Sequence, residues 1–139
     1  VLFTAHSLPE RILEMNDPYV DQLLMTSRLI AEQTGISRWQ FAWQSAGRTA
    51  DPWLGPDILD VMTDLQKQGV KEILACPIGF VSDHLEILYD LDIEAKQHAA
   101  ELGVHFERVR SLNQDPKYIK LLRDLVVELK DRAPGSYEM

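Results

Sequence analysis

The stretch "KEILACPIGFVSDHLEILYDLDIEAK", residues 71–96, decides the fold class that this sequence predicts. Residues 71–78 are mostly apolar and have the length of a buried β-strand, and Gly79 follows them. From residue 80 onward, apolar residues recur with the spacing of an amphipathic helix. A strand followed by a helix predicts one unit of a parallel sheet, because neighbouring parallel strands need a long crossover connection between them.

The same alternation of strand and helix patterns occurs four times along the chain. Asp17 and Asp115 each precede a proline where a helix is expected to begin, and Gly35 and Gly69 follow two of the expected helices. Four such units predict an α/β domain with a parallel four-stranded sheet and helices on both faces. The strands are expected at residues 1–5, 38–45, 71–78 and 104–109, and the helices at 18–35, 56–69, from 80, and from 116 to about Arg132.

The composition narrows the class of protein. With 139 residues, 45% of them hydrophobic, the chain is expected to form one domain. The 14 Lys and Arg against 22 Asp and Glu give a formal net charge of -8, which disfavours nucleic acid and anionic membranes as partners. No apolar run is long enough for a membrane span, and the single Cys76 leaves no disulfide, as is typical of the cytoplasm. The start "VLFTA" resembles a strand without an initiator methionine, so we expect a longer parent protein.

The carboxyl ends of the strands are the expected place for a functional site. In open parallel sheets, ligands bind beyond these ends, where the strand order reverses. With the strand order 2-1-3-4, the loops after the first and third strands face each other, and these loops carry His6 and Glu86. Trp53, in the loop after the second strand, is expected on the rim of the same crevice, where aromatic side chains often line flat apolar ligands.

An acidic row runs along the third helix, with Glu86, Asp90 and Glu94 at spacing i, i+4, i+8. Three neighbouring carboxylates repel one another, and a bound cation or raised carboxyl pKa values would relieve that repulsion. With His6 opposite, these oxygen and imidazole groups suit Fe²⁺, Mn²⁺ or Mg²⁺, or a centre for proton transfer.

A solvated helix face is the second interpretation of the acidic row. Acidic residues in a first helical turn are favourable for the helix dipole, and Asp83 with Glu86 fits a variant of the capping box. A histidine in the place of His6 is more often a hydrogen-bonded residue at a strand end than a metal ligand. In this interpretation the buried face lies opposite the acids and consists of Leu88, Leu91, Ala95, Ala99 and Leu102.

Other polar residues carry weaker signals. No GxGxxG motif or P-loop follows a strand, which disfavours nucleotide binding. Ser7 stands beside His6 but lacks the GxSxG elbow of serine hydrolases, so a serine nucleophile is not expected. His84 fits either a helix cap or a second proton-transfer group that orients Glu86.

Four motifs carry a family resemblance: "FTAHSLPE", "DPY", "WQSAGRTADPWLGPD" and "CPIGFVSDHLEILYDLDIE". In kind, order and approximate spacing they resemble the C-terminal half of the ferrochelatases, enzymes that insert ferrous iron into a porphyrin. The resemblance covers residues 1–127 and implies a Rossmann-like, chelatase-like domain with three αβα layers. It also implies that residues 1–139 are the C-terminal domain of such an enzyme, without the N-terminal half that supplies the other wall of the porphyrin cleft.

The resemblance implies roles for the histidine and the acids. His6 and Glu86 match the catalytic pair over the porphyrin centre, which handles pyrrole protons and metal. His6 is then either the proton acceptor or an iron ligand. Asp90 and Glu94 match acidic positions that continue outward from Glu86 as a route for iron or protons, on a helix locally widened into a π-helix.

On the substrate side, Asp83 and His84 match supporting polar positions, and we expect Ser7, Trp53 and His84 to contact the porphyrin. The implied substrates are Fe²⁺ and either protoporphyrin IX or coproporphyrin III, with no tightly bound cofactor. Some family members carry an iron-sulfur cluster on C-terminal cysteines, but Cys76 lies in an expected strand, so no cluster is expected here. A cobalt or nickel chelatase of a tetrapyrrole and a non-catalytic domain that binds metal or tetrapyrrole are the alternatives.

Overall fold

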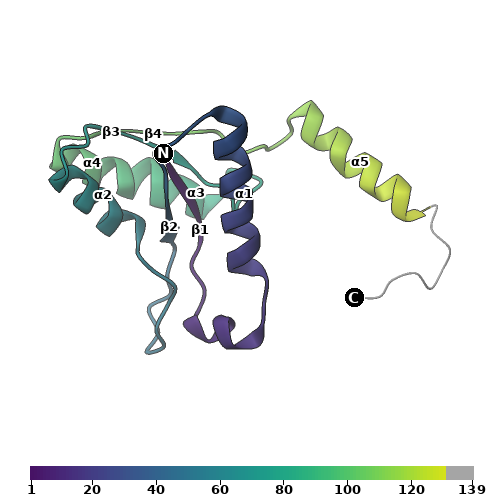
Figure 1. Ribbon diagram of the computed structural model, residues 1–139, viewed down its shortest axis with the longest axis horizontal. Helices are drawn as coiled ribbons and strands as arrows, with labels where there is room; N and C mark the ends of the chain where they lie inside the picture. The colour runs from purple at the N-terminus through teal and green to yellow at the C-terminus, as the bar shows by residue number, and fades with distance from the viewer. Residues whose placement is uncertain (131–139) are drawn as a thin grey trace.

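The computed structural model describes residues 1–130, and its centre is a sheet of four strands (Figure 1). The strand order is β2-β1-β3-β4, the order on which the expected position of the site depended. All neighbouring pairs are parallel, with Leu2 opposite Gln40 and Glu72 opposite His105. The strands are β1 (Leu2–His6), β2 (Gln40–Gln44), β3 (Glu72–Cys76) and β4 (His105–Arg108). The last three lie inside the expected ranges, and β1 extends one residue beyond its range.

Helices cover both faces of this sheet. Neighbouring residues of a strand point to opposite faces, and accordingly Ala42 and Trp43 of β2 belong to two different buried clusters. One helix contributes Leu23 to the cluster of Trp43, and another contributes Met62 to the cluster of Ala42. The expected three-layer αβα arrangement is therefore confirmed. These helices are α1 (Tyr19–Thr34) on the first face, and α2 (Ile58–Lys67), α3 (Leu85–Tyr89), the π-helical η2 (Asp90–Ala95) and α4 (Lys96–Leu102) on the second.

The last helix, α5 (Pro116–Lys130), extends away from the sheet (Figure 1). None of its residues is buried. Its predicted start at Pro116 is confirmed, and Asp115 accepts a hydrogen bond from the Lys117 amide at 2.8 Å, as a helix cap does. Its predicted end near Arg132 lies outside the described residues. Neither α5 nor any other helix in residues 1–130 is long and apolar enough to cross a bilayer.

Two local features differ from the sequence prediction. Residues expected to form a loop after β1 form the 3-10 helix η1 (Glu10–Met15). In addition, α2 begins at Ile58 and not at Pro56, because Asp57 is its N-cap. The Asp57 carboxylate accepts a hydrogen bond from the Leu59 amide at 2.9 Å and so satisfies one of the free donors of the first turn.

One continuous helical segment, residues 85–102, carries the acidic row and widens in its middle. Its ends are α-helical, whereas η2 is a π-helix, as the family resemblance implied. The fully buried residues repeat every four positions, which exceeds the 3.6-residue turn of an α-helix and fits a segment with a wider π turn. The prediction that Leu88 is buried is wrong, since it is 43% exposed. The residues that form the buried row are Ile87, Leu91, Ala95 and Ala99.

This four-residue repeat determines where the acids lie. Glu86 precedes buried Ile87 by one position, and Asp90 precedes buried Leu91 in the same way. One position is about 100° around an α-helix, so the acids flank the buried face and do not lie opposite it. The acids therefore do not lie opposite the core, but Glu86 and Glu94 are exposed to solvent, as the interpretation as a solvated face expected. The exposed row contains Leu85, Tyr89 and Ile93.

Candidate active site

Polar side chains from the ends of two strands and from the helix after β3 lie at the carboxyl edge of the sheet. His6 is the last residue of β1 and lies opposite Gln44, the last residue of β2. Ser45 follows in the left-handed backbone conformation, with a φ of 60°. Glu86 lies in the first turn of α3, after the loop that leaves β3. The loops after β1 and β3 therefore bring together the two residues that the strand order predicted.

The imidazole of His6 and the carboxylate of Glu86 face each other. Nε2 of His6 lies 3.6 Å from Oε1 of Glu86, and the two side chains are 31% and 50% exposed. The other ring nitrogen, Nδ1, is hydrogen-bonded to the backbone carbonyl of Ser7. A carbonyl oxygen can only accept, so Nδ1 carries a proton, and the lone pair of the neutral ring is on Nε2. The pair is arranged to hold a proton or a cation between Nε2 and the carboxylate.

Asp90 is held at the end of β2. Its Oδ2 accepts hydrogen bonds from Oγ of Ser45 and, at 3.4 Å, from Nε2 of Gln44. Gln44 is 1% exposed, and its Oε1 has no hydrogen-bond partner within residues 1–130. The sequence analysis missed Gln44 and Ser45 as site residues. They end β2 as His6 ends β1, so the same rule about strand ends would have found them.

Glu94, the outermost acid of the row, is exposed. It makes no hydrogen bond or ion pair with another residue in the described part of the chain. Within the same part, no three His, Cys, Asp or Glu side chains lie close enough together to enclose a metal ion. The proposed metal ligands His6, Glu86, Asp90 and Glu94 therefore do not form one compact cluster in the described residues, and metal binding by them stays a prediction.

His84 caps α3 directly beside the catalytic candidates. Its Nδ1 accepts a hydrogen bond from the Glu86 amide at 3.3 Å, so the cap holds the backbone of the residue that faces His6. The ring of Phe80 is next to both histidines, with its centroid 5.2 Å from that of His84 and 6.4 Å from that of His6. The capping interpretation of His84 is confirmed, and its contact with a substrate stays a prediction.

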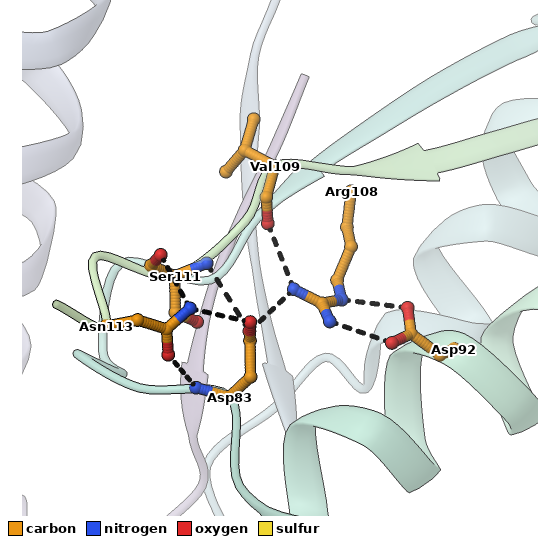
Figure 2. A network of polar contacts seen from close by, with 6 residues as sticks. All are labelled: Asp83, Asp92, Arg108, Val109, Ser111 and Asn113. Atoms are coloured by element: carbon orange, nitrogen blue, oxygen red, sulfur yellow. Dashed lines mark hydrogen bonds and ion pairs between the residues drawn. The ribbon is translucent and has the colours of Figure 1, made fainter. Parts of the chain in front are cut away.

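Asp83 does not form the expected capping box with Glu86. Its carboxylate accepts hydrogen bonds from Nδ2 of Asn113 and Nη1 of Arg108, both at 2.8 Å, and from the Ser111 amide at 3.4 Å (Figure 2). The hydrogen bond from Asn113, with that from the Ser111 amide and the charge of Arg108, lowers the pKa of Asp83 to about 2. The ionised carboxylate joins the loop before α3 to the loop after β4.

The loops after β1 and β2 are joined through Ser7 and Trp53. Ser7 is fully buried, and its Oγ donates to the Leu54 carbonyl at 2.7 Å. Nε1 of Trp53 donates to Oγ1 of Thr49 at 2.8 Å, and its ring covers Gly47, where an added Cβ would lie 2.3 Å from the indole. A substrate contact by Ser7 has no support here, because its hydroxyl is buried and already bonded. The contact by half-buried Trp53 stays a prediction.

Gly79 is a third residue that was not predicted from the sequence. A Cβ at this position would lie 2.5 Å from Cβ and 2.9 Å from Cα of Ala5, the residue before His6. The Gly79 amide donates to the Thr4 carbonyl at 3.1 Å. Only glycine therefore lets the loop after β3 lie directly against the end of β1. A glycine directly after a predicted strand was the available signal for such a close approach.

Two other ionisable groups near the site are shielded from water. Burial raises the pKa of the Cys76 thiol, which makes the thiolate scarce and the residue a poor nucleophile or metal ligand. Burial also raises the pKa of the Asp57 carboxyl, and the nearby acids Asp60 and Asp90 raise it further.

A family comparison identifies the chain. Residues 1–130 match the family model described as Ferrochelatase. The chain belongs to the ferrochelatase family. Curated ferrochelatases from Herpetosiphon aurantiacus and Deinococcus radiodurans are 53% and 48% identical to it over 126 and 128 residues. A coproporphyrin III ferrochelatase from a Geobacillus species is 46% identical over 129 residues.

The lengths of these ferrochelatases differ greatly from that of the chain. The three alignments cover 91%, 91% and 92% of this chain but 41%, 40% and 42% of the relatives. The chain therefore spans about two fifths of the length of these ferrochelatases. A similar solved structure is described as a putative cobalamin (vitamin B12) biosynthesis CbiX protein from Marinobacter aquaeolei. The superposition covers 95% of this chain and 97% of the CbiX chain. Its TM-score of 0.60 at 19% identity shows a shared fold.

The ferrochelatase motifs and the geometry coincide. The motif "FTAHSLPE" contains His6, the last residue of β1. The motif "WQSAGRTADPWLGPD" contains Gln44, the last residue of β2, and Ser45, which follows it. "CPIGFVSDHLEILYDLDIE" contains Gly79 and the acidic row up to Glu94. Three motifs that lie far apart in the sequence therefore meet at one edge of the sheet.

Proposed function

We propose that this chain is the C-terminal domain of a ferrochelatase, an enzyme that inserts ferrous iron into a porphyrin in haem biosynthesis. The observation that carries the proposal is the 3.6 Å approach of His6 Nε2 to Glu86 Oε1, at the carboxyl edge of the sheet, in a member of this family. Because the chain spans about two fifths of its relatives, we propose that the rest of the enzyme forms the other wall of the porphyrin cleft.

His6 is the proposed acceptor of the pyrrole protons. Iron insertion requires the porphyrin to lose both pyrrole N–H protons, and a positioned base accelerates such transfers. Nδ1 of His6 is already bonded to the Ser7 carbonyl, so Nε2 is the nitrogen that can accept. Glu86, 3.6 Å away, then stabilises the resulting imidazolium charge. Direct ligation of iron by the same nitrogen is the alternative role of His6.

The acidic row is the proposed path of the iron substrate. Carboxylate oxygens bind hard and borderline divalent cations, and ligands that occur singly release such ions more readily than a closed cage does. Glu94 is exposed, Asp90 is held at the end of β2, and Glu86 faces His6. An ion that passes along this order moves from solvent to the site of insertion, and protons can leave in the opposite direction.

The porphyrin is proposed to lie against the edge of the sheet, near Trp53 and His84. The relatives include proteins called ferrochelatase and coproporphyrin III ferrochelatase, so protoporphyrin IX and coproporphyrin III are both candidate substrates. Iron enters as a substrate and not as a resident cofactor, and we propose neither an iron-sulfur cluster nor a thiol ligand. We expect the enzyme to work in the cytoplasm.

The test uses the full-length protein that carries this chain. Purified anaerobically with Fe²⁺ and either porphyrin, it should convert the free-base absorption spectrum to that of the metalloporphyrin. Parallel reactions with Co²⁺ and Ni²⁺ show whether iron is the preferred metal. A spectrum unchanged with every combination would contradict the proposal.

Variants then test the proposed pair. We expect His6→Ala and Glu86→Gln each to lower kcat by about 100-fold or more, the range typical of a lost general base. The matched controls are His105→Ala and Glu107→Gln, because these residues form a similar pair on β4, with 3.9 Å between His105 Nε2 and Glu107 Oε1. Wild-type kcat in both site variants would refute the assigned roles.

A further inference from the structure

Arg108 is the last residue of β4 and has no hydrogen bond or ion pair with His6 or Glu86. It is bound to Asp83 in the loop before α3 and to Asp92 in η2 (Figure 2). Its side chain is only 9% exposed. Four of the five N–H donors of an arginine are used here, which is more than an ordinary surface ion pair uses.

Arg108 binds Asp92 in a two-pronged arrangement. Nε donates to Oδ1 of Asp92 and Nη2 donates to Oδ2, both at 2.8 Å. This pairing of a planar guanidinium with a carboxylate fixes the orientation of both groups. Asp92 lies within the π-helix η2, so Arg108 attaches the widened turn to the end of β4.

The same guanidinium also binds the loop before α3. Nη1 donates to Oδ1 of Asp83 at 2.8 Å and to the Val109 carbonyl at 3.2 Å. Asn113, with a φ of 49°, adds a reciprocal pair: its Nδ2 donates to Asp83, and its Oδ1 accepts from the Asp83 amide, each at 2.8 Å. Asp83 is therefore bound through its side chain and its backbone.

The two anchored residues enclose the chemically important part of the segment. Asp83 lies three positions before Glu86, and Asp92 lies two positions after Asp90. On the opposite flank of the helix, Ser45 and Gln44 bind Asp90. The segment is thus held from β2 on one side and from β4 on the other.

The segment needs such anchors because a π-helical turn is unfavourable and rarely forms without other contacts. Without the guanidinium, the carboxylates of Asp83 and Asp92 would share a partly buried place with no neutralising charge, and they would repel each other. Relaxation of that repulsion would move the start of α3 away from η2. The distance between Glu86 and His6 would change with it.

We propose that Arg108 is a positioning residue for metal insertion: by joining Asp83 to Asp92 it holds the π-helix and the start of α3 so that Glu86 faces the end of β1 and Asp90 faces the end of β2. This proposal rests on the proposed ferrochelatase function. It does not give Arg108 a contact with porphyrin or iron. The expected effect of its loss is therefore on the rate of the chemical step and on the local order of η2.

The kinetic test compares Arg108→Met with the control Arg110→Met in the full-length enzyme. Arg110 is exposed, lies two residues further along, and has no hydrogen bond or ion pair to another described residue. Since a small misplacement of reacting groups can lower rates about 100-fold, we expect Arg108→Met to lower kcat about 10- to 100-fold. KM for the porphyrin should stay within about twofold, because no substrate contact is removed.

Two conservative variants separate positioning from charge. Arg108→Lys keeps the positive charge but lacks the planar fork, so it should restore kcat only in part. Asp92→Asn removes the charged partner in η2 and should lower kcat as Arg108→Met does. Equal kcat for Arg108→Lys and the wild type would show that the forked pairing is unimportant and would contradict the proposal.

The structural readout is amide hydrogen exchange, followed by mass spectrometry without substrate. Arg108→Met should speed exchange in residues 83–95, with α1 and β1 unchanged, whereas Arg110→Met should change neither. Faster exchange in every element would indicate a role in overall stability alone and would overturn the proposal, as would an unchanged pattern. If the wild type inserts no metal at all, the proposed function fails, but this measurement still decides whether Arg108 orders η2.

Discussion

Two helical segments with similar sequence patterns differ in burial: one packs against the sheet and the other does not. Residues 85–102 and α5 both have apolar residues at helical spacing and charged residues between them. The first segment has four residues at 0–1% exposure and has acids bound on both flanks. In α5 no residue is buried, and Leu121, Leu125 and Val126 are 54%, 46% and 65% exposed.

The difference shows that an amphipathic pattern does not by itself determine whether the apolar face of a helix is buried. Both patterns favour a helix with one apolar face. The first segment lies against the sheet, where residues of β1, β3 and β4 complete the core around it. α5 extends away from that core (Figure 1). Burial, and with it the stability that a helix shares with its domain, comes from packing and not from the pattern.

The largest expected effect that distinguishes the two segments comes from removing a leucine in each. Leu91→Ala should lower the free energy of unfolding by about 2–5 kcal/mol, because Leu91 is fully buried and leaves a cavity. Leu125→Ala in α5 should change it by less than about 0.5 kcal/mol, as exposed substitutions do. Urea unfolding followed by circular dichroism measures both. Similar losses in the two variants would show that α5 is packed in solution.

Helix caps give a smaller test of the same difference. Asp57→Ala removes the cap of α2 and should lower the free energy of unfolding by about 1 kcal/mol, whereas Asp57→Asn keeps a capping side chain and should not. Asp115→Ala removes the cap of α5 and should reduce helical circular dichroism without a change in the unfolding midpoint. A midpoint that moves with Asp115→Ala would mean that α5 unfolds together with the domain.

The smallest expected effect concerns pH and compares Asp83 with Asp124 of α5. Both carboxyl pKa values are lowered, Asp83 to about 2 chiefly by Asn113, and Asp124 chiefly by its hydrogen bond from Lys120. A carboxyl whose folded pKa lies below its unfolded value stabilises the fold above the unfolded value and loses that stabilisation as pH falls. For Asp83 the loss should occur between about pH 4 and pH 2 and amount to roughly 1 kcal/mol or less.

Urea unfolding at a series of pH values in that range checks this prediction. Asp83→Asn should flatten the pH dependence of the unfolding free energy between pH 4 and pH 2. Asp124→Asn should leave it unchanged, because α5 contributes little to the global transition. If the wild type and Asp83→Asn lose stability in parallel over this range, the Asp83 network does not stabilise the folded state.

Much of the fold and part of the candidate site were predictable from the sequence. The four strands follow from local apolar runs and their parallel pairing from the helical connections between them, whereas the order 2-1-3-4 was assumed from flavodoxin-like sheets. The same topology predicted that His6 and Glu86 meet, because both follow neighbouring strands. Gln44, Ser45 and Gly79 were missed, although each stands at a strand end or directly after a strand. Arg108 gave no such signal, since an arginine at the end of a strand is usually solvated.

The sequence by itself determined the strands, most helix boundaries, the family motifs and the identity of the acids, because these depend on residues close together along the chain. The tertiary structure decided which flank of the helix the acids occupy, through the buried row that packs on the sheet and, from Asp90 onward, through the wider π turn. It also decided that Asp83 binds Arg108 and Asn113 and does not form a capping box with Glu86. Such choices depend on side chains brought from distant strands, and local patterns do not encode those distances.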